Sequence, residues 1–322
     1  MSETTAKSNW IKLALAFTAV YLIWGSTYIG IKFAIETMPP FFMIAVRFTI
    51  AGTIMYAFLR LRGVERPSRE HILPTFILGT LLLGIGGAGV VLAEKTLPTG
   101  LVSLLVATVP VYIVLLQWLR PGGTYPGVRV LAGLAVGVTG LIVLLGPEKL
   151  VNGSINLGGV ACVLVASLAA ACGALYSRQA VLPKSQQLTA SMEMIFAGLV
   201  MFVVSVVSGE FTQLHTMHVT AKSLFALLYL IVFGSMVAFS AYVWLLREVN
   251  PARVSTYAYV NPVVAVFLGW LMVNEPVTMQ TIAGATIVLS AVWLITQAPP
   301  KPKFERVPML LVKTRETCAV ES

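Results

Sequence analysis

Three charged side chains fall inside long apolar runs of this sequence, and they offer the most chemistry. Lys32 lies near the end of the first run, Arg47 well inside the second, and Glu193 near the start of the seventh. A charge within a membrane is costly, so each needs a partner or a function. The guanidinium of Arg47 cannot shed its charge, and it is either a structural anchor or part of a water-filled cavity. Lys32 can snorkel to the lipid headgroups. Glu193 can couple transport to protons, or it can snorkel or be neutralised.

Aromatic residues in the first run suggest a solute-binding wall. Trp24 and Tyr28 are four residues apart and therefore share one face of a helix. At mid-depth in a membrane, the indole N–H and the phenol O–H need partners. The pair suits the lining of a cavity that stacks apolar or aromatic solutes, and plain packing is the alternative. Tyr176 aligns with Tyr28 in the repeat described below, so we expect it at the same cavity.

Two prolines mark expected breaks in apolar helices. Pro110 falls in the fourth run with Tyr112 nearby, and Pro262 follows Asn261 in the ninth, where Tyr259 also lies. A proline removes a backbone donor and frees a carbonyl group. Such a break is tolerated at depth where neighbours or a cavity satisfy the freed group. We therefore expect Tyr112, Tyr259 and Asn261 to bind substrate beside these breaks.

Other motifs are not expected to carry chemistry. Gly84–Gly89 has the spacing of a dinucleotide-binding loop, but it lies inside an apolar run, where close helix packing or local flexibility explains it. His215 and His218 fall in a polar loop without cysteine, so we interpret them as solvated. Three cysteines are too few for a disulfide framework. We expect no metal and no cofactor.

Composition then defines the elements that must position these residues. The chain has 322 residues, of which 57% are hydrophobic and only 11% charged. A soluble domain carries roughly 25% charged residues, so a soluble enzyme, a disordered chain and a disulfide scaffold are excluded. The apolar runs match the ~20 residues that cross a bilayer. The sequence therefore predicts a polytopic membrane protein.

We predict ten membrane-spanning helices joined by loops too short for a soluble catalytic domain. Their ranges are 12–35, 39–60, 72–93, 98–119, 128–146, 157–178, 188–208, 223–246, 252–273 and 278–297. Of the 22 Lys and Arg residues, 17 fall on the side that holds both termini and three on the other side. The positive-inside rule then places both termini in the cytoplasm. The net charge of +9 thus reflects orientation, and no nucleic-acid partner is expected.

An internal repeat organises these helices. Similar residues recur at offsets of 146 to 152, which align Gly52 with Gly198 and Pro110 with Pro262. The offsets map the first five helices onto the last five, and an odd number makes the second set enter the membrane from the opposite side. Inverted repeats are a recurring plan of secondary transporters, whose sites lie near the midplane. The predicted domains are a tail, two five-helix repeats and a disordered tail, at 1–11, 12–147, 148–297 and 298–322.

Two rival functions are weighed against transport. A membrane-embedded enzyme acting on a lipid or apolar substrate is the main alternative. All 13 acidic residues are glutamate, which excludes intramembrane aspartyl proteases and Asp-rich prenyltransferase sites, and the three histidines lie in predicted loops. No H-E-x-x-H or G-x-S-x-G motif is present. A channel would need an oligomeric ring or a filter sequence, and neither is visible.

Several motifs resemble the EamA-type members of the drug/metabolite transporter superfamily. They are Tyr21–Tyr28, Pro39-Pro40, Arg47-Phe48, Leu97–Ser103 before Pro110, Asn250–Ser255, Asn261-Pro262 and Asn274–Pro276. The resemblance covers both halves. It implies ten helices in an inverted five-plus-five repeat, a central cavity lined by helices 1–4 and 6–9, and export of amino acids, other metabolites or drugs across a bacterial inner membrane. Glu275 has no acidic counterpart after the fourth helix, where Arg120 stands, so a gating or coupling role would belong to one half only.

We therefore expect an all-α integral membrane protein that is no enzyme. It would export small metabolites, such as amino acids or amphipathic drugs, by alternating access around a midplane cavity, with the solute and the lipid bilayer as its partners. The expected binding residues are Trp24, Tyr28, Arg47, Tyr112, Tyr176, Tyr259 and Asn261, and the candidates for coupling or gating are Glu193 and Glu275. The substrate, proton coupling, direction and the choice between monomer and homodimer stay open.

Overall fold

A computed structural model of the chain describes residues 3–119, 127–146, 155–213, 217–249, 254 and 256–296. Within these ranges the chain is helical and contains no strand. His215 and the tail from Ala298, which we expected to be solvated and disordered, lie outside the described residues.

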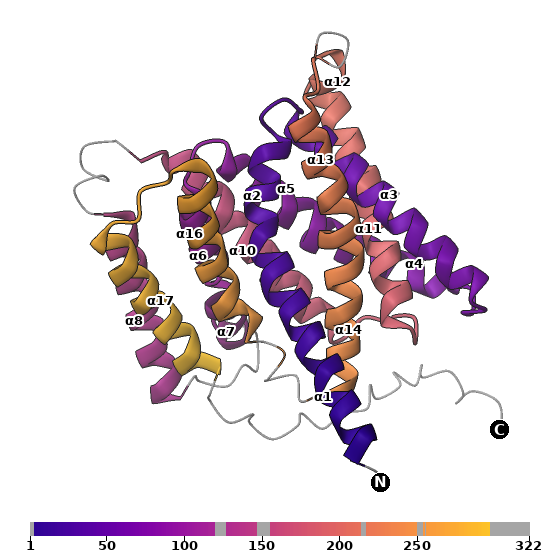
Figure 1. The fold of residues 1–322 in the computed structure, drawn as a ribbon, viewed down its shortest axis with the longest axis horizontal. Coiled ribbons are helices and arrows are strands. Elements are labelled where there is room, and N and C mark those ends of the chain that lie inside the picture. The colour runs from indigo at the N-terminus through magenta and orange to yellow at the C-terminus, as the bar shows by residue number, and fades with distance from the viewer. Residues whose placement is uncertain are drawn as a thin grey trace, which may run out of the picture.

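The helices follow the apolar runs of the sequence closely (Figure 1). In the first half they are α1 (Glu3–Thr18), η1 (Ala19–Ile23), α2 (Trp24–Ala34), α3 (Pro40–Leu61), α4 (Arg69–Leu78), η2 (Gly79–Ile85), α5 (Gly86–Glu94), α6 (Thr99–Val106), α7 (Val109–Leu119) and α8 (Val128–Leu145). In the second half they are α10 (Leu157–Ser177), α11 (Gln186–Val207), α12 (Glu210–Gln213), α13 (Ala221–Tyr229), η3 (Leu230–Val237), α14 (Ala238–Glu248), α16 (Tyr257–Val273) and α17 (Met279–Thr296). Each range that we predicted overlaps one of these helices or an unbroken run of them.

Local sequence signals explain where several helices begin and end. The Asn156 side chain accepts a hydrogen bond of 2.8 Å from the backbone N–H of Gly159, which caps the start of α10. Pro40 occupies the first position of α3, where its missing N–H costs nothing. Asn274 adopts a φ of 54° directly after α16, a left-handed conformation that ends a helix.

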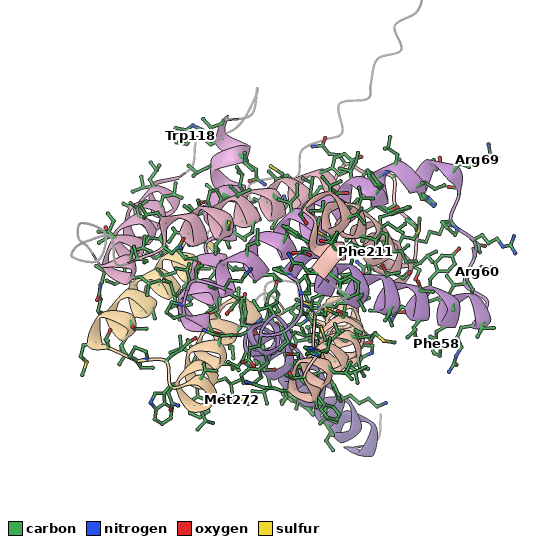
Figure 2. All side chains as sticks on the ribbon, turned by 90° about the horizontal axis from the view of Figure 1, so that it is seen from above. Phe58, Arg60, Arg69, Trp118, Phe211 and Met272 are labelled. Carbon is green, nitrogen blue, oxygen red and sulfur yellow. The ribbon has the colours of Figure 1, made fainter. Side chains whose placement is uncertain are left out.

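Seven helical stretches among the described residues are long and apolar enough to cross a membrane. They are Trp10–Ala34, Pro40–Leu61, Arg69–Glu94, Thr99–Leu119, Leu157–Ser177, Gln186–Val207 and Ala221–Leu245. Three further apolar helices, at 131–145, 257–273 and 279–294, are shorter. The outer surface is apolar as well. Figure 2, which looks down on the bundle, shows Phe58 and Met272 at its periphery, and both side chains are about half exposed. A surface of this kind suits lipid rather than water.

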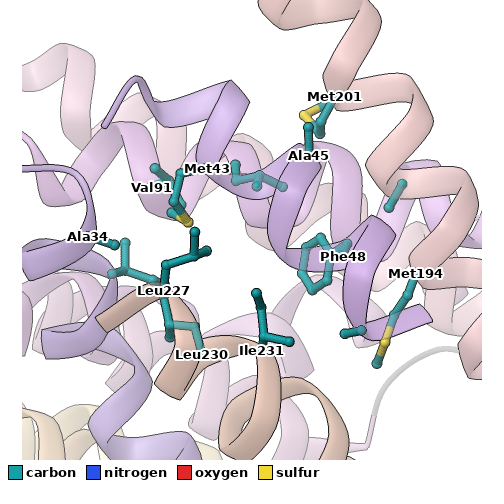
Figure 3. Close-up of a cluster of buried hydrophobic side chains, with 14 of the residues drawn as sticks. Ala34, Met43, Ala45, Phe48, Val91, Met194, Met201, Leu227, Leu230 and Ile231 are labelled. Atoms are coloured by element: carbon teal, nitrogen blue, oxygen red, sulfur yellow. The ribbon is translucent and has the colours of Figure 1, made fainter. Parts of the chain in front are cut away.

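Helices from both halves share the main hydrophobic core. The core lies between α2, α3 and α5 of the first half and α11, α13 and η3 of the second (Figure 3). Its buried side chains include Ala34, Met43, Phe48, Val91, Met194, Leu227, Leu230 and Ile231. The core therefore fixes α3, which carries Arg47, against η3.

Glycines allow the most extensive helix contact, that of α3 with α11. A Cβ on Gly52 would lie 2.8 Å from the carbonyl oxygen of Ser191, and a Cβ on Gly198 would lie 2.7 Å from the backbone nitrogen of Thr49. Real Cβ contacts are longer than this, so both positions require glycine for the observed approach. The helices α8 and α17 form a second large contact, at the edge of the bundle in Figure 1.

In the described part of the chain, three long helices pass through a π-helical segment. These segments are η1, η2 and η3. Short π-helical segments inside α-helices are frequent at functional sites. Leu82 of η2 and Ser235 of η3 reach the site described below. Hydropathy does not predict such segments, because a π turn has the same composition as an α turn.

The two predicted proline breaks turn out differently. The chain leaves helical geometry at 107–108, between α6 and α7, and Pro110 is the second residue of α7. The break precedes the proline because the ring clashes with the carbonyl four residues earlier, at Val106, where α6 ends. The break expected at Pro262 is absent, and this corrects the prediction. Helix α16 continues through Pro262, whose ring points back to Ala258, in the first turn of that helix.

Candidate functional site

A cavity of about 220 Å³ lies between the two halves of the bundle. Its walls come from α2, α3, η2, α5, α6, α7 and α10. The lining residues are Thr27, Tyr28, Ile31, Ile44, Arg47, Phe48, Leu82, Gly86, Gly87, Val90, Val91, Val106, Val109, Ala166, Ser167 and Ala170. Most of the wall is aliphatic or aromatic, and a few polar groups interrupt it. Pockets of this composition bind small amphipathic molecules.

Arg47 is the one charged residue of this lining. Its Nε donates a hydrogen bond of 3.0 Å to Ser235 Oγ of η3, and its guanidinium carbon lies 4.9 Å from the centre of the Phe48 ring. Gly234 permits the approach of η3, since a Cβ there would lie 3.3 Å from Arg47 Nη2. Among the described residues, no carboxylate lies within ion-pair distance of this guanidinium. Arg47 thus keeps donors for an anionic group in the cavity.

Ser167 supplies a second polar group without a partner. Its hydroxyl oxygen on α10 is buried and makes no hydrogen bond within the described part of the chain. A buried hydroxyl left unpaired costs free energy, so it is typically reserved for a ligand or a water molecule. Tyr28 contributes its phenol to the same cavity. The cavity therefore offers a cation and two hydroxyl groups against an apolar wall.

Trp24 lies one turn before Tyr28 and makes different contacts. Its Nε1 donates a hydrogen bond of 3.1 Å to the carbonyl oxygen of Gly234. Its ring centre lies 5.1 Å from those of both Tyr242 and Tyr257. Trp24 is not among the lining residues of the cavity, and it packs in an aromatic cluster beside it. Sequence analysis did not single out Tyr242 or Tyr257, because their proximity depends on how α14 and α16 pack on α2.

The other predicted binding residues lie away from this cavity. Tyr112 on α7, Tyr176 on α10 and Tyr259 on α16 are half-buried, Asn261 on α16 is buried, and none of them is part of the cavity lining. The carbonyl oxygen of Asn261 approaches Gly25 of α2. A binding role for these four residues stays a prediction. Glu193 lies on α11, where its backbone contacts Gly79 of η2, and it is not part of the lining either.

A second polar cluster joins the two halves at the distal face, which we define as the end of the bundle that holds the α2–α3, α5–α6 and α16–α17 connections (Figure 1). Lys32 Nζ lies 2.6 Å from Glu275 Oε1, so the lysine that we interpreted as snorkelling has a carboxylate partner. Glu275 also accepts hydrogen bonds from the backbone N–H groups of Thr99 (2.9 Å) and Gly100 (3.4 Å), at the start of α6. An acidic residue there is stabilised by the helix dipole.

Like Glu210 on α12, Glu94 is a buried acid that sequence analysis missed. It is the last residue of α5 and only 2% exposed. Its Oε2 accepts a hydrogen bond of 3.1 Å from Thr99 Oγ1, whereas its Oε1 is buried without a hydrogen-bond partner in the described residues. The predicted third helix stopped at residue 93, which placed Glu94 in a loop. Its position directly after an unbroken apolar run was the available signal.

A larger groove of about 450 Å³ opens on the outside of the bundle, between α16 and α17. No charged residue lines it, and its Val263, Phe267 and Trp270 are about half exposed. Despite its size, this groove has the character of a lipid-facing surface. The smaller cavity at Arg47 has the polar groups that a solute site requires.

Comparison with known proteins adds the family. The model of the EamA-like transporter family matches residues 10–146 and, a second time, residues 157–297. The chain is 36% identical over 293 residues to the inner membrane transporter YedA of Escherichia coli (strain K12), a match that covers 89% of this chain and 92% of YedA. It is 25% identical over 287 residues to the transporter YoaV of Bacillus subtilis (strain 168), with 89% and 97% covered. A crystal structure of a protein with 18% identity shares the fold at a TM-score of 0.61, covering 89% of this chain and 98% of that one.

Proposed function

Because the chain belongs to the EamA-like transporter family, we propose that it is an inner-membrane secondary transporter that exports small amphipathic carboxylates, apolar amino acids among them. Its relatives are named as transporters, which favours transport over enzymatic conversion. One observation carries the solute class: Arg47 offers its guanidinium to an otherwise largely apolar cavity, and no acid of the described residues forms an ion pair with it. A carboxylate matches the guanidinium in charge and geometry. The aliphatic wall would hold the apolar part of the solute.

We further propose ten membrane-spanning helices in two inverted repeats, at 12–147 and 148–297. The helix contacts support a two-fold relation, because the largest contacts between the two halves recur when each helix is exchanged for its repeat partner. Helix α3 contacts α11, and α8 contacts α17. The contact of α2 with α16 corresponds to that of α10 with α6, and the contact of α2 with α13 corresponds to that of α10 with α5. The segments η2 and η3 fall in the third and eighth helices, which are repeat partners.

Alternating access requires a barrier on each side of the cavity. At the distal face, several polar links join the first repeat to the second. They include Lys32–Glu275, Glu210 with the backbone N–H groups of Phe41 and Phe42, and Lys222–Glu36. On the other side, the Trp24–Tyr242–Tyr257 cluster closes the path. We propose that the distal links break as that face opens, while the aromatic cluster stays closed.

Counterflow into liposomes tests this function directly. Purified protein is reconstituted into vesicles loaded with one unlabelled amino acid, and entry of the same labelled amino acid is followed for a panel of apolar, polar and charged species. We expect protein-dependent counterflow for apolar amino acids. The function is wrong if no member of the panel, and no amphipathic carboxylate tested beside it, enters faster than into protein-free vesicles.

The enzyme alternative has its own discriminator. Purified protein in detergent has no second compartment, so transport cannot change the solute there. We expect each solute that shows counterflow to be recovered chemically unchanged after incubation with the protein in detergent. A new product by mass spectrometry would instead indicate an enzyme.

A further inference from the structure

The cluster at the distal face contains more negative than positive charge. Glu94 interacts electrostatically with Lys32 and with Glu275. Lys32 forms its 2.6 Å ion pair with Glu275. Glu94 instead accepts a hydrogen bond from the hydroxyl group of Thr99. Two carboxylates therefore share one ammonium group.

Lys95 directly follows Glu94 but is exposed, and the other described elements packed around Glu94 bring no further cation to this cluster. Helix α5 packs against α10, η2, α3, α2 and α6. The helices α10 and α6 and the segment η2 contain no charged residue. From α2 come Lys32 and the phenol of Tyr28, and from α3 come Arg47, which lines the cavity, and Arg60, near the opposite end of that helix. With both carboxylates ionised the cluster carries one net negative charge, and one proton makes it neutral.

Burial decides which carboxylate takes up that proton. Glu275 is satisfied as an anion, because it has the ammonium group and two backbone N–H groups of α6. Glu94 is 2% exposed, and its Oε1 has no donor within hydrogen-bond distance among the described residues. An ionised carboxylate buried in this way needs a cation or must be neutralised. Lys32 is the cation for which an ionised Glu94 would compete with Glu275.

We propose that Glu94 is a proton-binding site that controls the Lys32–Glu275 link and, through it, the opening of the distal face. A proton from water binds the Glu94 carboxylate, Lys32 then pairs with Glu275 alone, and Glu275 holds the start of α6 closed. Loss of that proton makes Glu94 compete for Lys32, which weakens the link and favours opening. Tyr28 lines the solute cavity and also interacts electrostatically with Glu94, so it connects the two sites. The proposal rests on the proposed function and adds the coupling ion to it.

The resulting cycle is an exchange of solute for proton. With the distal face on the outside of the cell, an external proton would bind Glu94 after solute release and close that face. The proton would leave to the cytoplasm once the opposite side opens. Inward movement of protons would thus drive export of the solute.

A distance measurement tests the switch without any substrate. Spin labels are placed at Pro98→Cys, just before α6, and Val277→Cys, in the α16–α17 connection, after the three native cysteines are replaced by alanine. Both positions are exposed and face each other across the Glu275 link. In sodium-free vesicles we expect a longer distance in alkaline than in acidic buffer. In the Glu94→Gln variant the distance between the labels should stay short in both buffers. In the Lys32→Met variant it should stay long in both.

An acid outside the distal face provides the control. Glu65 is exposed in the connection between α3 and α4 and belongs to none of the distal links, so Glu65→Gln should keep the pH response of the unmodified chain. An unmodified chain without a pH-dependent distance, or a Glu94→Gln variant that keeps the full response, overturns the proposal.

Transport separates this proposal from the proposed function. Glu94→Gln should slow counterflow, because it holds the distal face closed, and it should lose most of the several-fold stimulation by an imposed pH gradient. Full stimulation of that variant contradicts the proton site while the transport function stands. An unmodified chain that moves no solute contradicts the transport function, and the distance measurement still decides on the switch.

Discussion

At the scale of single residues, the cavity places a few polar groups against an apolar wall, and these groups can still bind a solute. Arg47 and Tyr28 were expected at such a cavity from their depth in the sequence, and both line it. Ser167 was not expected, because nothing in the sequence distinguishes one small residue of α10 from another. Only the packing around α10 shows that its hydroxyl group makes no hydrogen bond in the described structure.

Removal of the Ser167 hydroxyl should affect transport but not folding. Because the hydroxyl has no hydrogen bond to lose in the described structure, Ser167→Ala should unfold at the same temperature as the unmodified chain or slightly above it. If the hydroxyl binds the solute, the KM for transport should rise about threefold to tenfold, the value of one hydrogen bond. Ser205→Ala is the matched control, since Ser205 on α11 is also buried and unpaired but is not part of the cavity lining. Equal KM values for the two variants would exclude Ser167 from the site.

Trp24 should act through the position of η3. Trp24→Phe keeps an aromatic ring beside Tyr242 and Tyr257 but loses the hydrogen bond to the Gly234 carbonyl. A buried carbonyl left unpaired costs about 1–3 kcal/mol, so the thermal midpoint in detergent should fall by several degrees. Trp10→Phe, at a side chain that is 74% exposed, should leave it unchanged. Equal midpoints for both variants would show that the Trp24 hydrogen bond contributes nothing to stability.

At the scale of elements, the apolar runs predicted the helix positions closely because hydropathy is a local property. The third helix shows the limit of this reasoning. Its predicted end at residue 93 left Glu94 outside the helix. The proton site that we propose for the distal cluster is the carboxylate of that residue. The π-helical segments could not be predicted for the same kind of reason, since they depend on packing between η3, α2 and α3.

The crossing of α3 with α11 should be the most sensitive packing contact between the halves. Gly52→Ala and Gly198→Ala each place a methyl group against backbone atoms less than 3 Å away, so the two helices must separate. Overpacking of this kind costs about 1–3 kcal/mol. The thermal midpoint of each variant in detergent should fall. Gly127→Ala, where no atom lies within 4 Å of the added Cβ, should have no such effect. Unchanged midpoints for both crossing variants would contradict the observed approach of the helices.

At the scale of the whole molecule, the distribution of charge predicts how the protein sits in the membrane. The sequence assigns 17 of its 22 Lys and Arg residues to the side that holds the N-terminus, and the positive-inside rule predicts that this side faces the cytoplasm. The distal face, with Lys32, Glu94 and Glu275, would then face outward. This orientation is what the proposed exchange of solute for proton requires.

Labelling of intact cells tests the orientation. Thr278→Cys lies in the exposed α16–α17 connection of the distal face, and Lys12→Cys lies exposed on α1. In a background without native cysteines, a membrane-impermeant maleimide should label the first variant in intact cells and the second only after lysis. The reverse labelling pattern would show the opposite orientation in the membrane, and the proposed direction of proton movement would then be reversed.

The central claim is that the Arg47 guanidinium binds the carboxylate of the transported solute. Competition in the counterflow assay tests it most directly, with an apolar amino acid and its carboxamide as unlabelled competitors. At the unmodified transporter, the acid should compete about tenfold or more better than its carboxamide, because it gains a charge-assisted hydrogen bond. At the Arg47→Gln variant, the acid and the carboxamide should compete equally well. Arg62→Gln, at an exposed position after α3, should keep the preference. An Arg47→Gln variant that still prefers the acid as strongly as the unmodified chain would contradict the claim.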